Sequence, residues 1–260
     1  MWLFEFNDLR RCCPGGFSSY ILSKNPKANG TGISLPVEDG GHEFSLEERH
    51  RLRFHLFFAN LTYYQLGPSI SDDHRLQHLP FQLSGRSFDV VLLDGHQLRT
   101  QASAMPWDRD RLLISQLIIG LRSVKEAGTI IMKLPLPHKL VAARILYLFT
   151  MISSSLIGWK PTSMHANRGT SYAVAKGVGS GQNGSKTPMI LQALKNLWVS
   201  LTFGGEEGSG RFMVAEDLDF LVSLEDLVSH HLDWLTTLGT PLWKVQGTAL
   251  ERLYERKHIN

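Results

Sequence analysis

The chain has 260 residues, of which 43% are hydrophobic and 20% are charged, and its formal net charge is +3. This composition is sufficient for a full α/β domain with an extension, and the small charge does not by itself predict binding to nucleic acid. The eleven histidines show no metal-ligand spacing, and no apolar run reaches the roughly 18 residues that span a bilayer. The adjacent Cys12 and Cys13 make a poor structural disulfide, and the N-terminus has no signal-peptide pattern. We therefore expect an intracellular protein, of the cytoplasm or nucleus, without a metal ion or a membrane segment.

The first predicted unit is a strand, a glycine-containing turn, a helix and a second strand. Its parts, in order, are the apolar run Trp2–Phe6, the turn Pro14-Gly15-Gly16, the helix Phe17–Lys24 and the strand Thr31–Leu35. A glycine turn at the carboxyl end of the first strand of such a unit is typical of a nucleotide-type ligand site. The helix N-terminus at that turn favours a negatively charged or carboxylate-bearing group.

A polar turn with two acidic residues, Glu38 and Asp39, follows the second strand. The sequence then predicts a short helix from Ser45 to about Arg53 and a third strand over Phe54–Leu61, which contains Asn60. Residues 66–85 are broken by proline and glycine and are predicted to form a loop.

Two further strands end in charged residues. The near-continuous apolar run Ser87–Asp94 predicts a central parallel strand, and the carboxylate of Asp94 at its end faces the ligand crevice of such a sheet. Trp107–Val124 has helical spacing of leucine and isoleucine. The next strand, Thr129–Leu134, contains Lys133, and a lysine among apolar residues is costly unless it is paired, opens onto a site or reaches solvent at an edge.

The rest of the chain predicts a helix, a strand pair, a linker and a helical extension. These elements are the helix His138–Ser153, the strands Gly158–Thr162 and Thr170–Val178, and the helices Met189–Thr202, Leu224–Leu238 and Thr248–Lys257. The segment 179–188 is rich in glycine and serine and predicts a flexible linker. The expected domains are therefore 1–178, the linker 179–188 and the extension 189–260.

Three motifs together resemble one known family. They are D-L-x-x-x-C-P-G-G-F-S-S-Y-I-L with G-T-G-I-S-L-P, then F-D-V-V-L-L-D-G, and finally K-P-x-S-x-x-x-x-R with Y-x-V-x-K-G. The stretch from Asp8 to Val178 resembles the FtsJ/RrmJ-like ribose 2′-O-methyltransferases, especially the fungal FtsJ-like and cap-methyltransferase types. The resemblance implies a Rossmann-like sheet that binds S-adenosylmethionine (SAM), with helices on both faces and a closing antiparallel hairpin.

The resemblance also implies site residues and a substrate. SAM would contact Asp8, Pro14, Gly15, Gly16, Phe17, Asn60 and Asp94, with Glu38 or Asp39 beside its ribose unless these two are only a solvated acidic loop. Asp94 and Lys133 would be the middle pair of the family's K-D-K-E catalytic tetrad. The implied activity is methyl transfer from SAM to a ribose hydroxyl of RNA.

The chain departs from the family pattern at three points. Asp8 lies six residues before Pro14 where the family has five, and Thr170 stands at the position of the tetrad glutamate. The first tetrad lysine normally lies upstream of the glycine turn and has no counterpart in this chain. One interpretation is a methyltransferase whose N-terminal segment is absent from this chain. The alternatives are an inactive SAM-binding scaffold or RNA-binding module on the same fold, and a small-molecule methyltransferase.

Overall fold

The structure is a computed structural model that describes residues 16–68, 76–97, 105–163 and 165–258. The expected strand Trp2–Phe6 and the expected ligand residues Asp8, Pro14 and Gly15 lie outside the described residues. Within the described chain no helix is both long enough and apolar enough to cross a bilayer.

The fold is α/β, with a mixed four-stranded sheet and a separate parallel pair. The sheet contains β3 (Phe88–Leu93), β4 (Val124–Pro135), β6 (Thr170–Val178) and β5 (Ser153–Trp159), in the order β3-β4-β6-β5. Strands β3 and β4 are parallel, whereas β6 is antiparallel to both of its neighbours. The pair consists of β1 (Gly30–Ser34) and β2 (Phe54–Phe58). The prediction that Thr170–Val178 closes the same sheet as Phe88–Asp94 is confirmed.

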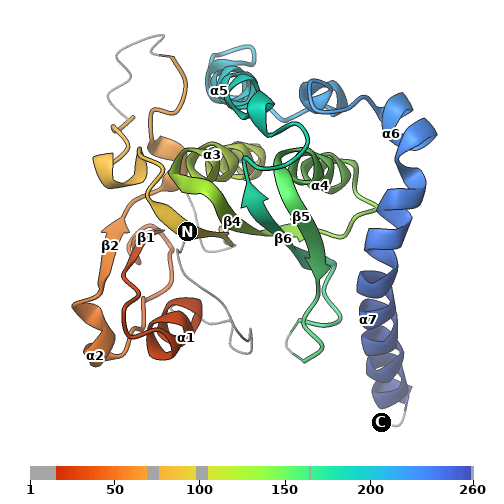
Figure 1. Ribbon diagram of the computed structural model, residues 1–260, viewed down its shortest axis with the longest axis horizontal. Coiled ribbons are helices and arrows are strands. Elements are labelled where there is room, and N and C mark those ends of the chain that lie inside the picture. Colours follow the sequence, from red (N-terminus) through yellow and green to blue (C-terminus); the bar gives the residue numbers. More distant parts are fainter. Residues whose placement is uncertain (1–15, 69–75, 98–104, 164, 259–260) are drawn as a thin grey trace.

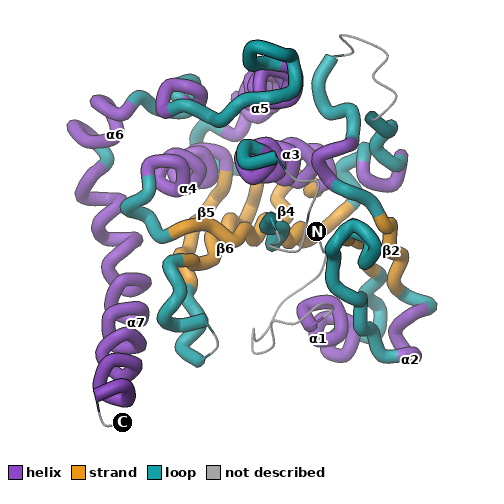
Figure 2. The backbone as a smooth tube through the Cα atoms, turned by 180° about the vertical axis from the view of Figure 1, so that it is seen from behind, coloured by secondary structure: helices purple, strands orange, loops and turns teal. Residues whose placement is uncertain are grey.

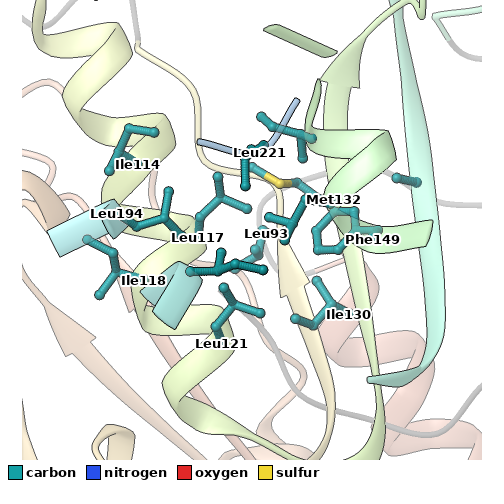
Figure 3. Close-up of a cluster of buried hydrophobic side chains, with 14 of the residues drawn as sticks. Leu93, Ile114, Leu117, Ile118, Leu121, Ile130, Met132, Phe149, Leu194 and Leu221 are labelled. Atoms are coloured by element: carbon teal, nitrogen blue, oxygen red, sulfur yellow. The ribbon is translucent and has the colours of Figure 1, made fainter. Parts of the chain in front are cut away.

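Helices cover the two faces of the sheet unequally. Helices α3 (Asp108–Ser123) and α4 (Leu140–Ile152) lie on one face, and α1 (Gly16–Lys24) lies on the other (Figures 1 and 2). Alternate strand residues point to opposite faces. Leu93, Ile130 and Met132 therefore join the leucine and isoleucine side chains of α3 in the larger core, as Figure 3 shows. Leu92 and Ile131 face the α1 side.

Residues beyond 178 belong to the same core. Helix α5 (Thr187–Phe203) packs on α3, and its Leu194 and Trp198 are fully buried. The segment 179–188, which the sequence predicts to be a flexible linker, contacts the end of α4: the N–H groups of Gly179 and Gly181 donate to the carbonyl of Ile152, at 2.7 and 3.1 Å. These bonds cap the carboxyl end of α4. Gly179 has a φ of 92°, a conformation that favours glycine.

The positions of α4 and β5 differ from the sequence prediction. We expected the helix to continue to Ser153 and the strand to cover Gly158–Thr162, but the helix ends at Ile152 and the strand covers Ser153–Trp159. The helix end therefore agrees with the prediction to within one residue, whereas the strand begins five residues earlier than predicted. Pro161 has no N–H group with which to continue a strand ladder.

The extension is helical, as predicted, but its boundaries differ. At the end of the chain the structure has α6 (Leu224–His230) and α7 (Leu232–His258). A short helix, α2 (Glu48–Arg51), lies near the start of the chain. Helix α7 is continuous through Pro241, where we expected two separate helices. Its Leu242 contacts the position of Gly158 on β5. The buried Arg144 of α4 pairs with Asp219 and so connects the extension to α4.

One arginine connects the pieces of the β1–β2 unit. The guanidinium of Arg53 donates to the carbonyls of Leu22, Asn25 and Ala28, at distances of 2.7 to 3.0 Å. It also donates to Nδ1 of the buried His50, at 2.9 Å. Burial lowers the pKa of His50 from 6.5, and the positive charges of Arg49 and Arg53 lower it further. Because Nδ1 accepts a hydrogen bond from a cation, the neutral imidazole is the form that fits.

This arrangement predicts a loss of stability in acid. Below pH 6.5 the unfolded chain binds a proton at His50 that the native state resists, so the free energy of unfolding falls as the pH drops toward the lowered pKa of the folded state. We expect a lower free energy of unfolding at about pH 5.5 than at about pH 7.5, measured by urea unfolding. His50→Gln should remove this decrease, whereas the exposed His42→Gln should keep it. An unchanged pH dependence in His50→Gln would contradict this account.

Candidate functional site

An ion pair stands where two adjacent parallel strands end. Asp94 directly follows the last residue of β3, and Lys133 lies two residues before the end of β4. Lys133 Nζ is 2.9 Å from Asp94 Oδ1. The side chains are 26% and 23% exposed, so the pair is shielded but open to a ligand. The two residues that the sequence predicts to be catalytic therefore lie together.

The first turn of α1 packs directly beside this pair. Phe17, the second residue of α1, packs with Leu92 and Ile131, which precede Asp94 and Lys133 by two residues on the same face of the sheet. Its ring also meets the edge of Tyr172, with centroids 6.1 Å apart. Tyr172 is the β6 residue opposite Lys133. The amino end of α1 is thus close to the ion pair.

The register of β6 places Thr170 on the same face. Lys133 pairs with Tyr172 and Pro135 pairs with Thr170, so Thr170 is a diagonal neighbour of Lys133. Such positions are about 7–8 Å apart, within reach of a longer side chain. Threonine supplies a hydroxyl there but no charge.

The loop before Thr170 is held by a buried lysine. Lys160 is 4% exposed, and its ammonium donates to the carbonyls of Arg168 and Thr170, each at 2.7 Å. Burial lowers the pKa of Lys160. The sequence identified Lys160 only as part of the hairpin motif. Its position between Trp159 and Pro161 was the available signal that it is not an ordinary surface lysine.

The other predicted ligand residues have different surroundings. Gly16 begins α1. Asn60 Oδ1 accepts hydrogen bonds from the N–H and the hydroxyl of Thr62, at 3.1 and 2.8 Å, so this oxygen caps a short helical turn. Glu38 and Asp39 are exposed in the turn that follows β1. No contact joins these three side chains to the ion pair in the described part of the chain.

One supporting residue was missed by the sequence reasoning. The amide of Gln116 on α3 bonds both backbone groups of Gly95, the residue after Asp94. The signal for it was a single amide within the apolar run L-L-I-S-Q-L-I-I-G-L.

The site offers an amine beside a carboxylate. No group of three His, Cys, Asp or Glu side chains gathers around a common point among the residues the structure describes. A lysine held by a carboxylate can orient a hydroxyl or take its proton, which is the requirement for activating an alcohol.

No protein-family model and no curated protein matches the sequence.

The Lys160 contacts lead to a stability prediction. Lys160→Met should lower the free energy of unfolding by about 1–3 kcal/mol, because two carbonyls lose a charged donor. Relief from burying an ammonium offsets part of this loss. Lys176→Met, at an exposed lysine on β6, is the matched control and should change little. Urea unfolding measures both, and equal stability of the two variants would show that the Lys160 bonds do not hold the loop.

Proposed function

We propose that this protein is a SAM-dependent ribose 2′-O-methyltransferase that acts on RNA. The observation that carries the proposal is the Lys133–Asp94 ion pair at the carboxyl ends of β3 and β4, beside the amino end of α1. The family resemblance assigns SAM to the glycine turn before α1 and assigns catalysis to this pair.

The strand arrangement supports the proposal. The orders β1-β2 and β3-β4-β6-β5, with β6 antiparallel, fit a Rossmann-like methyltransferase sheet in which one more strand stands between β1 and β3. The strand that the sequence predicts at Trp2–Phe6 lies outside the described residues. In open α/β sheets ligands bind outside the carboxyl ends of the strands, and Asp94 and Lys133 lie at those ends.

Residues near the amino end of α1 fit a ligand such as SAM. Ser18 is fully buried in the first turn of α1, and its hydroxyl has no hydrogen-bond partner among the described residues. The amino end of a helix attracts a carboxylate, and SAM carries one. When bound, SAM supplies an electrophilic methyl group.

The roles of the two charged residues follow from their geometry. Lys133 Nζ would hold the ribose hydroxyl in line for attack and, in its neutral form, would take the hydroxyl proton. Asp94 would hold the amine in place through the ion pair. The exposed His138, Lys139 and Arg168 occupy loops next to the ends of β4 and β6, where they could contact phosphate groups of RNA.

A catalytically inactive SAM-binding scaffold or RNA-binding module is the second candidate. Thr170 is the observation that favours it, because a neutral side chain stands where the family has a carboxylate. Under the main proposal the same residue makes the chain a slow enzyme.

The cofactor assignment predicts binding of S-adenosylhomocysteine. We expect saturable binding heat in isothermal titration calorimetry, weakened by Asp94→Ala. The matched control is Asp89→Ala. Asp89 lies on the same strand and pairs with Lys125 of β4 at 2.8 Å, in an exposed ion pair near the amino ends of the two strands. Absence of binding by well-folded protein would contradict the cofactor assignment.

The catalytic assignment predicts that Lys133→Ala lowers methyl transfer by about 100-fold or more while leaving S-adenosylhomocysteine binding nearly intact, since the amine acts on the acceptor hydroxyl. Lys125→Ala, which removes the exposed lysine at the other end of β4, should keep the activity. The measurement is transfer of labelled methyl groups from SAM to RNA, followed by nucleoside analysis.

A gain-of-function variant tests the role of Thr170. Thr170→Glu would place a carboxylate on the same face as Lys133, and we expect faster ribose methylation. Methylation of bases in place of ribose would refute the assigned reaction. Fast ribose methylation by the unchanged chain would refute our explanation of Thr170.

A further inference from the structure

The backbone that follows Asp94 is bonded by one side chain from α3. Gln116 Oε1 accepts a hydrogen bond from the N–H of Gly95 at 2.7 Å, and Gln116 Nε2 donates to the carbonyl of Gly95 at 3.0 Å. Nε2 also donates to the carbonyl of Leu112 at 3.4 Å. Gln116 is 3% exposed, and every polar atom of its amide has a partner. Only this orientation of the amide places its oxygen against the N–H and its nitrogen against the carbonyl.

The Gln116 hydrogen bonds lie just beyond the point where β3 ends its pairing with β4. The last pair in the β3–β4 register is Leu93 with Met132, so Asp94 lies one residue past the ladder. Backbone groups beyond the end of a ladder need other hydrogen-bond partners. Without such partners, the side chains of these residues are free to move. The Gln116 amide supplies both missing partners at Gly95. It therefore fixes the backbone on the carboxyl side of Asp94, while Leu93 fixes it on the other side.

The absence of a side chain at Gly95 makes the contact possible. A Cβ atom added to Gly95 would lie 2.8 Å from Gln116 Oε1, which is closer than a non-bonded contact allows. The Gln116 amide is the end of a flexible side chain and would move away. We call the two hydrogen bonds between the Gln116 amide and the backbone of Gly95 the clamp. Gly95→Ala therefore breaks the clamp without a substitution at Gln116 itself.

We propose that Gln116 is the positioning residue of the site: through Gly95 it holds the Asp94 carboxylate against Lys133. This inference rests on the proposed function, in which that ion pair is catalytic. Gln116 itself contacts neither charged side chain in the structure. A merely structural role would make Gln116 contribute to stability and leave the surroundings of Lys133 unchanged, and this difference makes the proposal testable.

The test measures the reactivity of Lys133 in the folded protein. Lys133 Nζ lies 2.9 Å from Asp94 Oδ1, and this contact shields the amine from an acylating reagent as long as it holds. Loss of the contact should therefore speed acetylation of Lys133 several-fold. Mass spectrometry reports the acetylation rate of Lys133 relative to that of Lys125. Lys125 serves as the internal reference because the variants leave its partner Asp89 unchanged.

Four variants make the experiment specific. Asp94→Asn removes the partner and sets the full effect, and Gln116→Leu and Gly95→Ala break the clamp in two independent ways. Ser115→Ala is the matched control, because Ser115 is the fully buried neighbour of Gln116 and its hydroxyl has no partner in the described chain. We expect both clamp variants to approach the acetylation rate of Asp94→Asn, and Ser115→Ala to match the unchanged protein.

The possible outcomes separate this inference from the proposed function. Slow acetylation of Lys133 in the clamp variants would overturn the positioning role, and so would a lack of effect in Asp94→Asn. If Gln116→Leu does not fold, Gly95→Ala decides. In the methyl-transfer assay the clamp variants should lower kcat about as much as Asp94→Asn does. Failure of methyl transfer by the unchanged protein and by Ser115→Ala, together with fast acetylation in the clamp variants, would contradict the methyltransferase and leave the positioning role standing.

Discussion

Strand β4 fixes the position of the site because it is constrained on all sides. It is paired along both edges, with β3 and with β6, and Ile130, Ile131 and Met132 are completely or almost completely buried. A slip of one residue would turn every side chain to the other face of the sheet. Lys133 would then enter the apolar core below α3 and α4, and burying an unpaired ammonium there costs several kcal/mol. Packing of apolar residues thus determines which face carries the charged pair.

The same two strands carry a second ion pair that shows what burial adds. Asp89 and Lys125 pair at 2.8 Å near the amino ends of the strands, with side chains 64% and 45% exposed. Exposed pairs of this kind contribute little, because water and salt screen them. The side chains of Lys133 and Asp94 are 26% and 23% exposed, less than half the exposed fraction of Asp89. Charges act more strongly on one another in such partly buried surroundings. Identical residue types therefore have different consequences at the two ends.

The sequence predicts those parts of the fold whose causes are local. The apolar runs of β3, β4 and α3 locate these elements within a few residues, and strand-end reasoning brings Asp94 and Lys133 together. The end of α4 was predicted to within one residue of Ile152. The start of β5 at Ser153 was missed, because the strand begins directly after a helix end whose capping groups, Gly179 and Gly181, come from far along the chain. The role of Gln116 could not be predicted either, because its amide and Gly95 meet only in the folded chain.

The supports of the site share one physical principle. A parallel sheet orders its residues by ladder hydrogen bonds, yet ligands bind just beyond the point where the ladders end. At that edge the chain uses side chains in place of backbone partners: Gln116 bonds Gly95, and Lys160 bonds the carbonyl of Thr170. Both supports are buried, and each acts through an adjacent backbone group on a position next to Lys133. A side chain just beyond a strand can therefore be held in place without ladder hydrogen bonds, provided that its backbone has a buried polar partner.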